Sequence, residues 1–285
     1  MFGMDRQVYY RSIKRKILRQ SRSEQVIVMV SKIRMTMPRI GTRKLYYLLN
    51  LELKTLKIGR DKFFKILKTN HLLIIPKRSY HITTDSHHRF KKHKNLIENL
   101  EIKRPEQVWV SDITYIGKRA KPCYLSLVTD AYSKQIMGYN VATNLNAENS
   151  LKALQMALKV RKDKCLTLIH HSDRGIQYCS DEYQKVIREA KNLLCSMTES
   201  YDPYQNAVAE RINGILKQEF MIDRYNDQEL DVIKLVVKES IQIYNLLRPH
   251  CSNYMLTPVQ MHQQKEIEMK TYKTKNRSNS KATSV

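Results

Sequence analysis

The sequence predicts an α/β protein preceded by a basic helical region, and the order of its residue patterns leads to this prediction. Between residues 105 and 263, short runs rich in β-branched and aromatic residues alternate with amphipathic helical patterns. Their order is three strands, a helix, a strand, a helix, a strand and two helices. Residues 1–78 show helical periodicity alone. We therefore expect a mixed five-stranded sheet flanked by helices, behind a separate helical region.

The charge of the chain divides in the same way. Residues 1–104 contain 26 basic and 7 acidic residues, a net charge of +19, whereas residues 105–263 contain 19 and 18. The tail, residues 264–285, contains 6 basic and 2 acidic residues. A strongly basic half joined to a nearly neutral half is typical of a nucleic-acid-binding protein with a separate core. The ordinary alternative is that the basic residues only cover solvated helices.

The first part of the chain is expected to begin with two helices. Helical periodicity covers residues 6–20 and 23–35, with a break at Ser21–Ser23 and an end at Pro38. This pattern predicts two consecutive helices with a turn between them.

A pair of short helices is expected next, over residues 41–51 and 59–73. Thr42 and Asp61 stand near the two helix starts, where a side-chain oxygen can accept a hydrogen bond from a free backbone N–H. The pair predicts a helix-turn-helix, although a plain helical hairpin would give the same pattern. Basic residues on the second helix favour duplex DNA as its ligand: Arg60, Lys62 and Lys65.

Residues 79–104 are expected to form a basic linker that contacts phosphates, and residues 264–285 a disordered basic tail. The 5 cysteines are scattered and no signal peptide is recognisable, which favours a cytoplasmic protein. No apolar run approaches the roughly 20 residues of a membrane span, so we expect no membrane partner.

Within the predicted core the expected elements alternate along the chain. A turn at Ala131–Lys134 separates the second and third strands, and Asn146 or Asn149 caps the helix after them. The strands are expected within residues 107–116, 123–142, 166–169 and 193–197, and the helices within 146–160, 180–190, 206–220 and 227–247.

Three carboxylates occupy unusual positions in this layout. Asp112 lies inside an otherwise apolar strand, Asp173 ends a later strand, and Glu210 lies early in a helix. A carboxylate in an apolar strand is costly unless it is paired, hydrogen-bonded or bound to a metal. Taken singly, the three also have ordinary explanations as a strand-edge residue, a turn former and a solvated helix position.

The helix that contains Glu210 has a polar face. Asn206, Glu210, Asn213 and Lys217 are spaced four, three and four residues apart and therefore share one side of the helix. Such a face suits a bound phosphodiester and its metal. Together with two strand carboxylates it could hold a pair of Mg²⁺ ions for an in-line displacement at phosphorus. The apolar positions that can pack on the sheet point elsewhere: Ile212, Leu216 and Phe220.

A zinc site at His170 and His171 is the competing metal hypothesis. Strand alternation sends these two side chains to opposite faces, which disfavours a shared ion. His171 could instead orient a carboxylate or the substrate, and a satisfied structural histidine is the alternative. The sequence also lacks a Walker-type loop and a nucleophile elbow.

Four ordered blocks resemble the second-frame product of the insertion-sequence-three family of transposases. The blocks are "WVSDITYI", "IHHSDRGIQYCS", "SYDPYQNAVAERINGILKQE" and "YNLLRPHCSNYMLTPVQ", and the match extends from about Ile40 to Gln260. The resemblance implies a retroviral-integrase-like, ribonuclease-H-type core that cuts and joins DNA strands at the ends of an insertion sequence.

The resemblance also implies roles for individual residues. Asp112, Asp173 and Glu210 match the catalytic, metal-binding triad, for two Mg²⁺ ions that Mn²⁺ replaces, and Lys217 matches a lysine that contacts DNA. We expect further DNA contacts from Asn206, Asn213 and Arg174, with His171 supporting the triad. Other motif positions match without a clear role: Gly175, Tyr244, Asn245, Arg248, Pro249 and His250.

The implied partners are duplex DNA, namely element ends and target, and further copies of the chain assembled on it. An upstream-frame product, fused or separate, is a further expected partner, and the implied location is the nucleoid of a prokaryotic cell. Between Asp173 and Glu210 lie 36 residues, one more than is usual in the family, and the extra residue falls near "REAKNLLCSM". The alternatives are a catalytically silent DNA-binding regulator derived from a transposase, and a nuclease acting on RNA–DNA hybrids.

Overall fold

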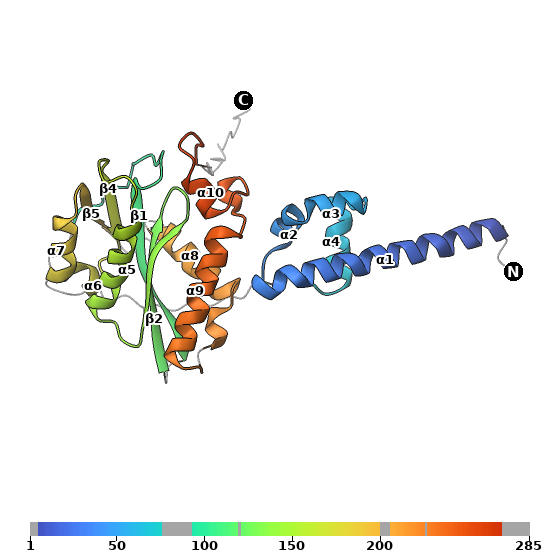
Figure 1. Cartoon of the computed structure of the whole chain (residues 1–285), viewed down its shortest axis with the longest axis horizontal. Helices are drawn as coiled ribbons and strands as arrows, with labels where there is room; N and C mark the ends of the chain where they lie inside the picture. The colour runs from blue at the N-terminus through green and yellow to red at the C-terminus, as the bar shows by residue number, and fades with distance from the viewer. Residues whose placement is uncertain (1–4, 76–92, 119–120, 200–205, 226, 270–285) are drawn as a thin grey trace, which may run out of the picture.

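A mixed sheet forms the centre of the protein. The computed structural model describes residues 5–75, 93–118, 121–199, 206–225 and 227–269. The predicted mixed sheet of five strands is confirmed, and the strands lie in the order β3-β2-β1-β4-β5 (Figure 1). Their bounds are β1 Val108–Lys118, β2 Lys121–Asp130, β3 Ile136–Ala142, β4 Leu168–Ser172 and β5 Leu193–Met197.

The direction of pairing changes at β1. On one side β1 pairs with β2, and β2 with β3, in antiparallel register. On the other side β1 pairs with β4, and β4 with β5, in parallel register. The β1–β4 ladder is short, from Val108–Ile169 to Ser111–Ser172, so β1 continues beyond the end of β4.

Helices cover both faces of the sheet (Figure 1). Trp109 and Val128 pack in one apolar cluster with helices of the first face, whereas Ile116 and Leu125 pack in another with helices of the second face. The first face carries α5 (Ala147–Val160), α6 (Ile176–Cys179) and α7 (Asp181–Glu189), and the second carries α8 (Ala207–Gln218) and α9 (Leu230–Leu246).

Several short elements were not predicted, because three to five residues are too few to show a helical period. Besides α6 they are the 3₁₀ helices η2 (Ile222–Tyr225) and η3 (Cys251–Asn253), and α10 (Pro258–His262).

Close packing of α5 on β3 depends on one glycine. A Cβ atom on Gly138 would lie 2.1 Å from the carbonyl oxygen of Ala153 and 2.8 Å from the amide nitrogen of Ala157. Distances this short are not tolerated, so glycine at this position lets the helix backbone approach the strand.

The N-terminal region consists of four helices that extend to one side of the core, as Figure 1 shows. The first, α1, runs without interruption over Arg6–Thr36, so the predicted break at Ser21–Ser23 is wrong. Serine lowers helix stability by only tenths of a kcal/mol relative to alanine, which does not by itself end a helix. The predicted end before Pro38 is confirmed.

The predicted helix pair is more finely divided in the structure. Its first member is two short helices, α2 (Thr42–Leu48) and α3 (Asn50–Thr55), and its second is α4 (Arg60–Thr69). The expected caps are wrong, because the N-cap residues are Gly41 and Gly59 and neither end has a side-chain capping hydrogen bond. Asp61 instead pairs with Arg60 at 3.0 Å on the exposed surface.

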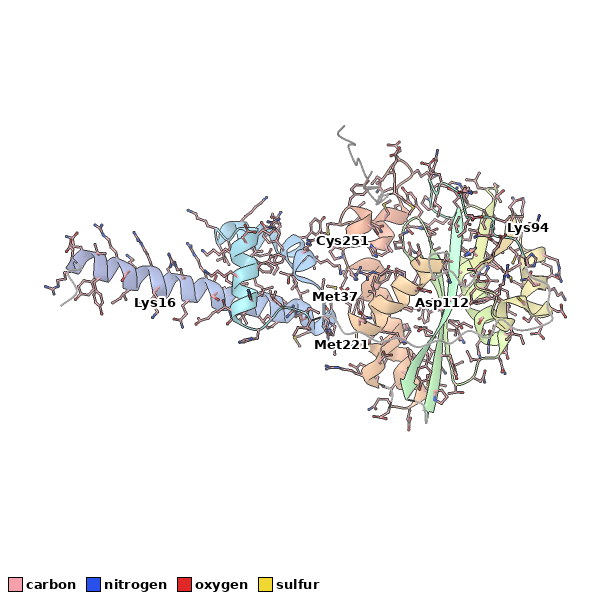
Figure 2. All side chains as sticks on the ribbon, turned by 180° about the vertical axis from the view of Figure 1, so that it is seen from behind. Lys16, Met37, Lys94, Asp112, Met221 and Cys251 are labelled. Atoms are coloured by element: carbon pink, nitrogen blue, oxygen red, sulfur yellow. The ribbon has the colours of Figure 1, made fainter. Side chains whose placement is uncertain are left out.

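The predicted linker and tail lie partly outside the described residues, namely at 76–92 and 270–285. The described part of the linker runs beside β5, where the Leu96 N–H donates to Ser196 Oγ at 2.9 Å. Lys94 marks this segment in Figure 2, on the side of the core away from the N-terminal helices. Among the described helices, none combines the length and the apolar character that crossing a membrane requires.

Candidate active site

Two predicted carboxylates lie together where β1 and β4 separate. Ser111 and Ser172 are the last residues paired in the parallel β1–β4 ladder, and Asp112 and Asp173 are the next residue of each strand. Parallel strands present their carboxyl ends at the same edge of a sheet, and ligands bind there where the strand order reverses. The sheet therefore delivers both side chains to one site.

Asp112 is held by two hydrogen bonds. Its Oδ1 atom accepts from the Ile113 N–H at 2.9 Å, and its Oδ2 atom accepts from Asn213 Nδ2 at 2.7 Å. Burial and the negative charge of Asp173 raise the pKa of Asp112 to about 7 in spite of these bonds, and Glu210 adds a smaller effect in the same direction. The site thus carries negative charge that the nearby protein groups do not fully compensate.

Asp173 is oriented by the turn that follows it. The N–H of Gly175 donates to its Oδ1 atom at 3.0 Å. A Cβ atom on Gly175 would lie 3.0 Å from that same oxygen, so a larger residue would crowd the carboxylate.

The polar face of α8 contacts β1. Besides the bond from Asn213 to Asp112, Lys217 Nζ donates to Thr114 Oγ1 at 3.1 Å and Asn206 Nδ2 donates to the Ser111 carbonyl at 3.1 Å. Both asparagines are buried, with 3% and 7% of their surface exposed, so their amides reach β1 and not the surface. The predicted DNA contacts of these two amides stay predictions.

Glu210 stands apart from the two aspartates. It lies in the first turn of α8 and is exposed, although partial burial raises its pKa. Within the described residues, no three His, Cys, Asp or Glu side chains are grouped closely enough to hold a metal ion. The structure therefore brings Asp112 and Asp173 together and keeps Glu210 within range of their charge, without closing a three-carboxylate site.

A small pocket, with a volume of about 20 Å³, opens beside the two aspartates. Tyr115 and Tyr124 form part of its wall, as an edge-to-face pair with ring centroids 5.9 Å apart. The sequence patterns did not single out these tyrosines, because aromatic residues in strands usually serve the core. The complete lining is Asp112, Ile113, Tyr115, Tyr124, Leu145, Asp173, Gly175, Gln177 and Tyr178.

The donor set fits a hard divalent cation in part. Two carboxylates with oxygen ligands, next to a pocket and with uncompensated charge, suit Mg²⁺ or Mn²⁺. In contrast, the adjacent histidines have other partners: His170 Nε2 lies 2.8 Å from Ser111 Oγ, and His171 Nδ1 lies 2.9 Å from Ser196 Oγ. Burial lowers the pKa of His170 to about 3, so it is neutral. These contacts give the two histidines structural partners and agree with the argument against zinc.

The remaining predicted DNA contacts lie on the surface or beside the site. Arg60, Lys62 and Lys65 are exposed on α4, far along the chain from the carboxylates. Arg174 follows Asp173 directly and is half-buried.

The extra residue before Glu210 does not disturb the sheet. In the segment where it was expected, α7 ends at Glu189 and β5 begins at Leu193. β5 pairs with β4 without a break, from Leu168–Leu193 to Ser172–Met197. Asn192, with φ of 53°, makes the tight connection and is held by bonds from its amide to the carbonyls of Lys164 and Cys165. The β4–β5 register is therefore regular.

Comparison with known proteins assigns the chain to a family. The integrase core domain family matches residues 102–203, and a second integrase core domain family matches 191–258. Over 256 residues the chain is 32% identical to an uncharacterized 31 kDa protein of insertion element IS600 from Shigella sonnei, a match that covers 88% of this chain and 92% of that protein. The chain belongs to the transposases of the insertion-sequence-three family.

Named members of this family align with part of the transposase. It is 33% identical over 173 residues to transposase InsF of IS3fB from Escherichia coli K12, covering 60% of this chain and 59% of that one. It is 34% identical over 142 residues to the IS629 transposase of Shigella sonnei, covering 50% and 47%. A simian T-cell lymphotropic virus intasome structure aligns with a TM-score of 0.49 at 18% identity, covering 79% and 75%. The transposase is a polynucleotidyl transferase of the DDE type with an integrase core.

Proposed function

We propose that this transposase cuts and joins DNA strands at the ends of its own insertion sequence, with Asp112, Asp173 and Glu210 as the carboxylates that bind two Mg²⁺ ions. The observation that carries the proposal is the pair of aspartates after the β1–β4 ladder, where burial and repulsion raise the pKa of Asp112 to about 7. Such a site favours a cation, since binding one relieves the repulsion between the carboxylates.

The chain's own groups hold the ligands in place. Asn213 and the Ile113 N–H fix the two oxygens of Asp112, and the Gly175 N–H fixes Asp173. Glu210 completes the ligand set from the exposed first turn of α8, close enough to act on the pKa of Asp112. Bound Mg²⁺, or Mn²⁺ in its place, activates the attacking water or 3′-hydroxyl and stabilises the leaving oxygen in an in-line displacement.

Basic groups hold the DNA. Lys217 and Arg174 lie on the elements that carry Glu210 and Asp173, and we assign them contacts with phosphates near the reacting bond. Arg60, Lys62 and Lys65 on α4 contact the duplex farther along, with Asn206 and Asn213 supporting the site from the α8 side through their bonds to β1. His171, buried one residue before the end of β4, keeps Asp173 in place through the strand.

We assign the protein three further features on the same grounds. It acts as a homo-oligomer on duplex DNA that includes element ends and target. It works with an upstream-frame product, fused or separate. It associates with the nucleoid of a prokaryotic cell.

The test uses the purified chain, labelled duplexes with the element ends, and Mg²⁺ or Mn²⁺. The proposal predicts nicking and strand joining by the wild type, and loss of both in Asp112→Asn, Asp173→Asn and Glu210→Gln with DNA binding retained. Unchanged strand transfer in these variants would contradict it. DNA binding without nicking in the wild type would favour a silent regulator, and preferential cutting of RNA–DNA hybrids would favour a hybrid-specific nuclease.

A further inference from the structure

One carboxylate joins the N-terminal helices to the catalytic core. Glu219 is the residue that ends α8, and its backbone carbonyl accepts from the Arg39 N–H at 2.9 Å. Its side chain accepts from Lys44 Nζ of α2, at 2.9 and 3.1 Å to the two oxygens. The same two oxygens accept from Arg248, from Nη2 at 2.8 Å and Nε at 3.0 Å. Glu219 therefore binds side chains from two distant segments at once.

The three charged side chains are shielded from water. The exposed fractions are 13% for Lys44, 11% for Glu219 and 2% for Arg248. Burial alone would raise the pKa of Glu219, but Arg248 and Lys44 outweigh it and the pKa is lowered. Burial and the charge of Arg248 lower the pKa of Lys44, against the opposite effect of Glu219. Two cations thus depend on one anion in a poorly hydrated place, where pairing geometry matters most.

Apolar packing surrounds this ion cluster. Ile40 and Leu45 of the N-terminal region and Phe220 and Ile222 after α8 belong to the same buried cluster. Figure 2 shows Met37, Met221 and Cys251 at this junction, which lies away from Asp112. Apolar contact holds two surfaces together but specifies their relative rotation weakly. Within the core, Arg248 fixes the direction of the Glu219 carboxylate through two guanidinium nitrogens, so the Lys44 ammonium that crosses the junction meets an acceptor of set position.

The Arg248 side of the cluster is anchored in the sheet. Tyr244 donates to the Lys134 carbonyl at 2.8 Å, and the Asn245 side chain bonds to both backbone groups of Ile136, at 3.0 and 2.9 Å. This gives a structural role to the "YNLLRPH" motif, which the reaction itself leaves without one. The motif fixes Arg248, and Arg248 fixes Glu219.

The other end of the connection is the active site. α8 runs from the turn with Glu210 to Glu219, and on the way Asn213 binds Asp112 and Lys217 binds Thr114. We propose that Glu219 is a positioning residue of the transposase: by holding Lys44 against Arg248 at the end of α8, it sets the orientation of the N-terminal DNA-binding helices relative to the catalytic carboxylates. Duplex DNA bound by those helices is then presented to the carboxylates with the same phosphodiester each time. This inference rests on the proposed function.

Lys44 offers the cleanest test, because its replacement leaves the Glu219–Arg248 pair within the core intact. Lys44→Met keeps the aliphatic stem and removes the charge, and Lys44→Arg restores a cation. Lys152→Met is the matched control, since it breaks an exposed lysine–glutamate pair on α5, with Glu148 at 2.7 Å. Thermal unfolding of each variant verifies that it is folded.

Two readouts are compared on the full chain: the position and rate of nicking on a labelled element end, and small-angle X-ray scattering without DNA. For Lys44→Met we expect an altered scattering profile, nicks spread over neighbouring phosphodiesters, and a kcat lower by about 10- to 100-fold, since misplacing reacting groups by about 1 Å costs this much. The Kd for DNA stays within about twofold, because no phosphate contact is removed. Lys44→Arg and Lys152→Met behave as the wild type.

Wild-type scattering and wild-type nicking in Lys44→Met would overturn the proposal. So would a change in only one of the two, because altered scattering alone means a purely structural contact, and altered nicking alone means that Lys44 acts on DNA directly. A wild type that does not nick at all refutes the proposed function instead. Scattering of Lys44→Met then still decides whether the Glu219 cluster sets the placement of the helices.

Discussion

Asp112 and Asp173 follow directly on one residue pair of the parallel β1–β4 ladder, Ser111 and Ser172, so the two carboxylates leave neighbouring strands at the same level. Beyond this pair β1 continues to pair with β2 alone. Residues of β1 and of the turn after β4 line the pocket where the two strands separate. The sheet itself therefore creates the burial and the repulsion from Asp173 that together raise the pKa of Asp112. The following predictions test this relationship and the packing around it.

Removing the charge at Asp112 should stabilise the metal-free protein above neutral pH. Its pKa in the folded state is about 7, raised from 3.8, so the folded state retains a proton that the unfolded state loses. Stability therefore falls as pH rises from about 4 to about 7, and the loss is complete above that range. With EDTA at about pH 8, Asp112→Asn should exceed the wild type by about 2–4 kcal/mol in urea unfolding.

The difference should shrink as the pH is lowered towards about 3, where the wild-type carboxyl is mostly protonated in both states. Added Mg²⁺ should stabilise the wild type but not Asp112→Asn, because only the folded carboxylate pair binds the ion. Equal stabilities at all pH values would show that the two aspartates do not strain the fold.

The order of strands and helices along the chain and most strand positions were predictable, because alternation and β-branched residues indicate a buried sheet directly. The order of the strands within the sheet was not predicted. β5 was predicted at its observed bounds, 193–197. The continuity of α1 was not predictable from Ser21–Ser23, since packing of Val26 and Val30 along the helix outweighs local propensity. For the site, the spacing of Asn206, Glu210, Asn213 and Lys217 correctly indicated a shared face, but not that this face would bind β1.

The free energy of unfolding should depend on pH over a second range, because of His262. Burial alone would lower its pKa, but the carboxylates of Asp130 and Glu106 outweigh this effect and raise it to about 9. Its nitrogens lie 3.7 Å from carboxylate oxygens of both, and Nδ1 lies 3.0 Å from Ser133 Oγ. A histidine whose pKa is raised in the folded state contributes its full stabilisation below the unfolded-state pKa of about 6.5. This contribution is lost as the pH rises to about 9.

His262→Gln should therefore be less stable than the wild type by about 3 kcal/mol near pH 6, and the gap should close above about pH 9. Urea unfolding at both pH values measures it. This window lies above the one from Asp112, so the two effects are separable. A gap that is the same at both pH values would mean that packing, and not charge, explains the role of His262.

Gly138→Ala should destabilise the core severely. The new Cβ would meet the Ala153 carbonyl oxygen at 2.1 Å, so β3 and α5 must separate. We expect a loss of at least about 2 kcal/mol, as for other overpacked cores. Gly214→Ala is the matched control, since nothing lies within 4 Å of the corresponding position in α8 and helix propensity predicts a gain of about 0.5–1 kcal/mol. Thermal unfolding distinguishes the two, and equal effects would refute the packing argument.

Replacing the exposed lysines of α4 should change the affinity for duplex DNA and not the reaction at the carboxylates. Lys62→Ala and Lys65→Ala should each weaken duplex binding to a similar extent on all sequences and reduce the salt dependence of log K by about 1, as expected for one lost phosphate contact. Titrations at several salt concentrations measure this slope. Lys152→Ala on α5 is the control, and a slope unchanged by the α4 variants would remove α4 from the DNA interface.

The ion cluster around Glu219 illustrates what the sequence could not reveal. Lys44 and Arg248 are separated from Glu219 by 175 and 29 residues, and each looks like an ordinary surface charge in its own helix pattern. No local period connects them, so only the folded chain brings them together. The pocket tyrosines, Tyr115 and Tyr124, escaped prediction for a related reason, since their strand pattern is that of any core aromatic.

The central claim is that Asp112, Asp173 and Glu210 bind the divalent cations, and anomalous scattering from Mn²⁺-soaked crystals tests it most directly. The account predicts Mn²⁺ about 2.2 Å from carboxylate oxygens of Asp112 and Asp173, with Glu210 as a further ligand. The same soak of Asp112→Asn should lack the ion between the two aspartate positions. Mn²⁺ bound only elsewhere on the wild-type protein, or no ion at these carboxylates at millimolar Mn²⁺, would contradict it.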